Sequence, residues 1–131
     1  MSFDWRDYLE LSRLLVVNNN EASFRSAISR AYYAVFNVLR IHAGYNTRGG
    51  QDFSHATFIQ QLVSANDDII QKLPFHETSD LTHIGNELNE LRRLRNSCDY
   101  DGTTPPTPKI AQDCIEKVEA IFELLDEALE Y

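Results

Sequence analysis

Long apolar runs are absent from this chain of 131 residues. No segment approaches the roughly 18 consecutive apolar residues that a membrane-spanning helix needs, and residues 1–7 are too acidic and polar for a secretory signal. Cysteine is also scarce. Cys98 and Cys114 are too few for a disulfide scaffold, and their spacing matches no zinc pattern. We therefore expect a cytoplasmic protein with reduced thiols, no metal and no other cofactor.

Positive charge is the second shortage. The net charge is −8, and the excess of acid grows along the chain, from +2 over residues 1–50 to −4 over 51–100 and −6 over 101–131. An acidic domain repels phosphate backbones, so nucleic-acid binding would need a local cationic site. Arg92, Arg93 and Arg95, together with arginines of the first half, are the candidates for such a site.

Strand-like alternation, internal repeats and low-complexity tracts are missing too, and glycine and proline are sparse. Apolar residues instead recur at helical spacing nearly throughout, and the length suits one domain over residues 1–131. The sequence predicts an all-α bundle with helices over residues 3–17, 21–43, 55–64, 67–73 and 79–100 and a last helix from Pro108. The residues expected at helix ends are the N-caps Ser2, Asn20, Ser79 or Asp80, and Thr107, and the C-terminal Gly44.

The longest predicted helix, residues 21–43, has two different faces. One is apolar and ends in His42, which we interpret as a core histidine with its hydrogen bonds satisfied. Its opposite side is aromatic and polar, so the helix is expected to pack on both sides, against either another helix or a second subunit. Tyr32 and Tyr33 are interpreted as packing residues, with base stacking as the alternative. The expected dimer or packing face comprises Ser29, Tyr32, Tyr33, Phe36 and Arg40.

Arg95 stands in an apolar stripe of the helix predicted over residues 79–100. At about 100° per residue, Arg95 lies about 20° from Ile84 around the helix axis. Arginine cannot lose its charge, and burying it alone is costly. It therefore either pairs with a carboxylate, for which Asp99 is one turn away, or lines a polar cleft. Arg92 and Arg93 are expected on the solvated side of the helix, near Glu87 and Glu90.

Two segments together resemble the HEPN domain family (higher eukaryotes and prokaryotes nucleotide-binding). Residues 25–36 contain Ala-Tyr-Tyr-Ala followed by Phe36, as in small prokaryotic members, and residues 91–101 contain the pattern Arg-x-x-x-Asp-Tyr that begins at Arg95. His55, which stands before an apolar helix, also fits the usual layout. The resemblance extends over about residues 5–130.

The resemblance implies an up-and-down bundle of four to five helices that is commonly a homodimer. Many members are metal-independent RNases of toxin–antitoxin, CRISPR and phage-defence systems. Their motif is an Arg, usually followed by Asn or another polar residue, with a His four to six positions on. Two motifs meet across the dimer to form one composite site. Other members accompany a small nucleotidyltransferase encoded beside them.

This chain departs from the family motif at one position. Arg95 and Asn96 match, but Tyr100 stands where the His is expected. A neutral His is a natural general base or acid near pH 7, whereas Tyr, with an ordinary pKa near 10, is a poor base. Tyr100 either caps the end of its helix or points into the cleft.

Three hypotheses follow. The first is a dimeric HEPN-fold protein of a toxin–antitoxin or defence system that binds a nucleotide, an RNA phosphate or a partner protein, with Arg92 and Asp99 in its cleft. The second is an active metal-independent RNase that uses Arg95, Asn96 and Tyr100. The third is a structural partner of a small nucleotidyltransferase, in which Tyr100 is a target for modification.

Overall fold

The chain folds into a bundle of helices, as the sequence predicts. The computed structural model describes residues 4–45, 55–100 and 105–130, and these contain no strand. None of their helices is long and apolar enough to cross a membrane. In chain order the helices are α1 Asp7–Val17, α2 Glu21–His42, α3 His55–Ser64, α4 Asp67–Lys72, α5 Thr78–Tyr100 and α6 Pro108–Leu129.

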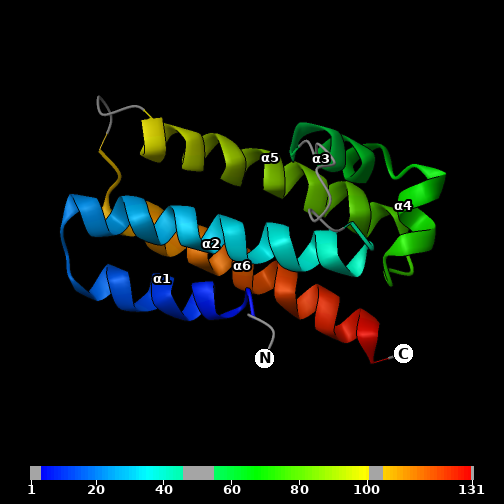
Figure 1. The fold of residues 1–131 in the computed structure, drawn as a ribbon, viewed down its shortest axis with the longest axis horizontal. Helices are drawn as coiled ribbons and strands as arrows, with labels where there is room; N and C mark the ends of the chain where they lie inside the picture. Colours follow the sequence, from blue (N-terminus) through cyan, green and yellow to red (C-terminus); the bar gives the residue numbers. More distant parts are fainter. Residues whose placement is uncertain (1–3, 46–54, 101–104, 131) are drawn as a thin grey trace.

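Helix α2 forms the centre of the bundle. It packs against α1, α5 and α6, while α3 packs on α5 (Figure 1). Tyr32 and Phe36 are buried on its α3/α5 side, and Ile28 and Leu39 are also fully enclosed. The two-sided packing expected of this helix is therefore provided within one chain, with α5 on the aromatic side and α1 and α6 against the remainder.

The predicted N-caps of α2 and α6 and the predicted C-terminal glycine of α2 are confirmed. The Asn20 side chain accepts a hydrogen bond from the backbone N–H of Ser23, and Thr107 caps α6 in the same way, with Pro108 in its first turn. Gly44 follows α2 with φ of 81°, a conformation that glycine adopts without strain.

Two helix starts differ from the sequence expectation. Helix α1 begins at Asp7, and the expected cap Ser2 lies outside the described residues. Helix α5 begins at Thr78, so Ser79 and Asp80 lie inside its first turn instead of capping it. The backbone N–H of Asp80 already bonds to the carbonyl of Glu77, which extends the turn N-terminally.

Gly85 lets α3 and α5 approach closely. A Cβ atom added at Gly85 would lie 2.6 Å from the backbone nitrogen of Val63, closer than such atoms pack. Beside this contact, the Thr82 hydroxyl donates to the Val63 carbonyl at 2.9 Å. These contacts fix α3 against α5 and thereby place His55, the first residue of α3.

Candidate functional site

Arg95 is buried where the helical spacing places it. It is 7% exposed and shares its face of α5 with the enclosed Leu88 and Leu91. Its nearest carboxylate is Asp99, with Nη1 3.4 Å from Oδ2. This is a long contact for an ion pair, and the Asp99 side chain is 28% exposed. One carboxylate at this distance pairs Arg95 only weakly.

The guanidinium of Arg95 lies over two tyrosine rings. Its central carbon is 5.0 Å from the ring centroid of Tyr33 and 5.3 Å from that of Tyr32. Ring faces attract the positive charge, but they do not replace hydrogen-bond acceptors in the guanidinium plane. The Nε atoms of Arg95 and Arg92 are both buried without a hydrogen-bond partner among the described residues. Buried donors of this kind are rare, and an incoming acceptor would satisfy them.

His55 supplies a neutral imidazole beside this pair. Its ring stacks on Phe36, with centroids 3.8 Å apart and planes 5° apart, and its Nδ1 lies 2.8 Å from the Tyr32 hydroxyl. Burial, and after it the charges of Arg95, Arg92 and Arg40, lower the pKa of His55 from 6.5 to about 4. The imidazole is thus uncharged at neutral pH.

Tyr32 stays protonated under the same conditions. Burial raises the pKa of its phenol above the usual value, although the nearby Arg95 and Arg92 act in the opposite direction. Tyr32 is fully enclosed, and its ring contacts those of Tyr33 and His55. It therefore connects the imidazole of α3 to the guanidinium of α5 through a single side chain of α2.

The remaining predicted site residues differ in how exposed they are and in what they contact. Asn96 is partly exposed beside Arg95, and the Ser29 hydroxyl lies 3.5 Å from the Asp99 carboxylate.

Tyr100 is 81% exposed. Five residues of helix rotate its side chain by about 140° from Arg95, so in one protomer it faces solvent. Arg93 is also exposed and pairs with Glu90, as expected of the solvated side. The same expectation was wrong for Arg92, which is partly buried with its Nε atom enclosed.

Two arginines of α2 have structural partners. Arg40 is buried, and it donates to the side chain of Asn37 at 2.7 Å and to the carbonyl of Tyr45 at 3.1 Å. Arg25 donates to the Cys98 carbonyl at 3.0 Å near the end of α5. This interaction of Arg25 was not predicted, because it joins residues 73 apart in the chain.

The interpretation of His42 was wrong. It is exposed, and it is the last residue of α2. The histidine with a buried contact is His55. Its position before an apolar helix was the available sequence signal, but its partners Tyr32 and Phe36 lie on another helix. In the part of the chain that the structure describes, no three His, Cys, Asp or Glu side chains gather as a metal would require.

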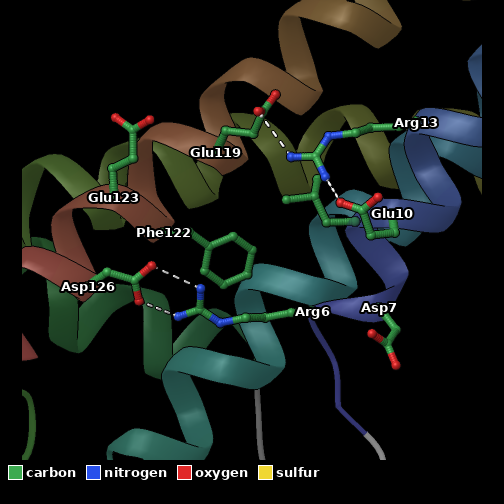
Figure 2. A pocket seen from close by; sticks show the side chains of 9 residues that line it. Arg6, Asp7, Glu10, Arg13, Glu119, Phe122, Glu123 and Asp126 are labelled. Carbon is green, nitrogen blue, oxygen red and sulfur yellow. Dashed lines mark hydrogen bonds and ion pairs between the residues drawn. The ribbon is translucent and has the colours of Figure 1, made fainter.

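A groove of about 310 Å³ lies between α1 and α6. Figure 2 shows its ion pairs: Arg6 makes two hydrogen bonds to Asp126, and Arg13 bridges Glu10 and Glu119. The guanidinium of Arg6 also lies 4.5 Å from the ring centroid of Phe122.

The arginines of this groove therefore already have carboxylate partners. They join α1 to α6, and the groove lacks the unsatisfied donors of the Arg92/Arg95 site.

Comparison with known proteins agrees with this architecture. Neither the curated proteins nor the solved structures that were compared with the chain gave a match. The sequence model of the HEPN domain, in contrast, matches residues 6–128. That range runs from just before α1 almost to the end of α6 and contains the whole site around Arg95. The chain belongs to the HEPN domain family.

Proposed function

We propose that this protein binds a phosphate group of a nucleotide or of RNA at the site formed by Arg92 and Arg95. The observation that carries the proposal is the buried guanidinium of Arg95, whose Nε–H has no acceptor among the described residues. A phosphate oxygen accepts such hydrogen bonds, and arginine suits the planar recognition of phosphate.

The local charge supports an anion at this site. Arg92 and Arg95 lie one turn apart on α5, and the carboxylate of Asp99 is the contact of Arg95 at 3.4 Å. The site is cationic within a chain of net charge −8. A phosphate would therefore find favourable potential there and repulsion over much of the remaining surface. This predicts modest binding of short nucleic acids.

The proposal includes a homodimer in a toxin–antitoxin or defence system. HEPN domains often dimerise, and two copies of Arg95 near each other would need an anion between them. The exposed Tyr100 at the end of α5 would then be available to a second copy. Light scattering at micromolar concentration tests this part, and a strict monomer would contradict it.

Binding of fluorescently labelled single-stranded RNA in EDTA tests the proposed site. Arg95→Gln should weaken binding at least tenfold, while the matched change Arg93→Gln, on the exposed side of α5, should leave it nearly unchanged. With two arginines on the phosphates of each protomer, the slope of log K against log salt should be about −1.4. Equal affinities for the wild type and both variants would refute the site.

Metal-independent RNA cleavage is the second candidate function. It is favoured because Arg95 and the partly exposed Asn96 keep the first half of the family motif. Arg95 would stabilise phosphate charge in the transition state, Asn96 would orient the phosphate, and Tyr100 would replace the His. Incubating total RNA in EDTA with the wild type and with Arg95→Ala distinguishes cleavage by this protein from cleavage by a contaminating nuclease. Equal residual cleavage by both would exclude this function.

The third candidate is a structural partnership with a small nucleotidyltransferase. The 81% exposure of Tyr100 is what modification of its hydroxyl would require. Intact-mass measurement after incubation with a nucleotidyltransferase encoded beside the gene, comparing the wild type with Tyr100→Phe, tests it. The absence of a mass increase on the wild type would argue against it.

A further inference from the structure

We infer that His55 provides the imidazole that the motif on α5 lacks, with its Nε2–H acting as a third donor to the phosphate bound by Arg92 and Arg95. This inference rests on the proposed function and deepens it. The family motif places a His on the same helix as the Arg, whereas here the imidazole comes from the first residue of α3. Tyr100 then need not replace the His at all.

The hydrogen bond to Tyr32 fixes the tautomer of His55. The Tyr32 hydroxyl is buried and protonated, so its hydrogen needs an acceptor. Nδ1 of His55 lies 2.8 Å away and is the acceptor that the described residues offer to it. A neutral imidazole that accepts at Nδ1 carries its hydrogen on Nε2. The nitrogen left for an incoming group is therefore a donor, as an anion requires.

The ring is also held in place before any ligand arrives. Phe36 lies parallel to it at 3.8 Å, and Tyr33 meets it edge to face at 6.3 Å. The contact between Gly85 and Val63 fixes the helix from which the ring projects. A donor with this little freedom loses little entropy when it binds.

Tyr32 and Tyr33 bring the imidazole and the guanidinium of Arg95 to one place. Each tyrosine ring contacts both groups, with the Arg95 carbon 5.0–5.3 Å and the His55 ring 5.8–6.3 Å from the tyrosine centroids. His55 also remains partly exposed, whereas Tyr32 is not. A phosphate that reached the Nε–H of Arg95 would thus lie beside the same two tyrosine rings that the partly exposed His55 contacts.

Binding of an anion should change the proton affinity of His55. The charged groups that face it are Arg40 on α2 and Arg92 and Arg95 on α5, and all three disfavour the imidazolium. The rings of Tyr32 and Tyr33, whose phenols are also titratable, contact the His55 ring. A bound phosphate offsets part of the arginine charge, so the ring should gain protons from solvent more readily.

The test is a titration of inorganic phosphate into histidine-¹⁵N-labelled protein, followed by NMR of the ring nitrogens. We expect a saturable shift of the His55 Nε2–H signal and a midpoint of ring titration that moves to higher pH when phosphate is bound. His55→Phe, which keeps the stack on Phe36 but removes both nitrogens, should weaken phosphate binding about tenfold. His55→Gln restores a donor near the Nε2 position and should recover binding to within about threefold of the wild type.

The variants separate failure of this inference from failure of the proposed function. If Arg95→Gln abolishes phosphate binding while His55→Phe binds as the wild type does, the phosphate site stands and the role of His55 is wrong. If the wild type binds no phosphate, both are wrong. Because His55→Phe could disturb α3, its unfolding midpoint is compared with that of Tyr32→Phe. That variant loses the same Tyr32–His55 hydrogen bond but leaves the sequence of α3 unchanged. Should His55→Phe be unstable, an unshifted Nε2–H signal in the phosphate-saturated wild type would by itself overturn the inference.

Discussion

Arg95 and Asp99 face each other across one turn of α5, with Nη1 and Oδ2 3.4 Å apart. The Asp99 side chain is partly exposed, so water screens the pair, and such a contact is worth about 1 kcal/mol or less. Asp99 therefore orients Arg95 without neutralising its hydrogen-bonding capacity. On the proposed function, this relationship leaves the Nε–H of Arg95 to a phosphate.

Asp99→Asn should strengthen phosphate binding at the site by a few fold, because it removes the competing carboxylate and keeps the side-chain shape. The free energy of unfolding should fall by less than about 1 kcal/mol. Glu90→Gln is the matched control, since it removes one charge from the exposed pair with Arg93 on the same helix. A larger gain from Glu90→Gln than from Asp99→Asn would show that net charge, not the Arg95 contact, controls affinity.

The stability of the protein should fall as the pH is lowered from about 6.5 to about 4. The pKa of His55 is lowered to about 4 in the folded protein by burial and by the arginines around it, against 6.5 ordinarily. The unfolded chain therefore binds more protons in this window, so the folded state loses stability as the pH falls, and this loss is complete below the folded pKa. Urea midpoints followed by circular dichroism between pH 4 and 7 measure the slope.

His55→Gln should flatten this slope, because it removes the titrating ring. His83→Gln is the control, since His83 is an exposed residue of α5. An unchanged slope in His55→Gln would mean that carboxylates alone cause the pH dependence.

Gly85→Ala should destabilise the fold by about 2 kcal/mol, because the added methyl group would overpack the backbone of α3 at Val63. Its neighbour Asn86 is exposed, and Asn86→Ala should leave the stability unchanged or raise it slightly through better helix propensity. Thermal and urea unfolding of both variants measure the difference. Equal stability of the two would contradict the close approach of α3 and α5.

Asp126→Asn should affect stability only slightly and phosphate binding not at all. The Arg6–Asp126 pair is well aligned, but both side chains are more than a third exposed, so its loss should cost less than about 1 kcal/mol. This pair lines part of the groove in Figure 2, which lies between α1 and α6. If Asp126→Asn altered phosphate affinity as strongly as Arg95→Gln, the binding site would have to be sought in the groove.

The sequence predicts helices and the burial of Arg95 well because both follow from local periodicity. Apolar spacing near 3.6 residues identifies the helices. The angle of Arg95 around its helix axis, close to that of Ile84, places it on the apolar face that packs into the core. The caps Asn20 and Thr107 were predictable for the same reason, since a cap depends on residues within one turn.

The partners of His55 were not predictable in this way. Tyr32 and Phe36 precede it by 23 and 19 positions and contact it only after α3 has packed onto the bundle. The interpretation of His42 failed because periodicity gives the direction of a side chain but not how completely the neighbouring helices cover it. Tertiary contacts decide both, and they also bring Arg25 to the end of α5.

The most direct test of the account is the NMR signal of the Arg95 Nε–H group during titration with inorganic phosphate, assigned by comparison with Arg95→Lys. Because this donor is buried and unpaired among the described residues, a bound phosphate should shift its proton resonance downfield in a saturable manner. The Arg92 Nε–H should follow with the same dissociation constant, and the exposed Arg93 should not. Phosphate that shifts the Arg93 signal as much as the Arg95 signal, or shifts none of the three, would contradict the account.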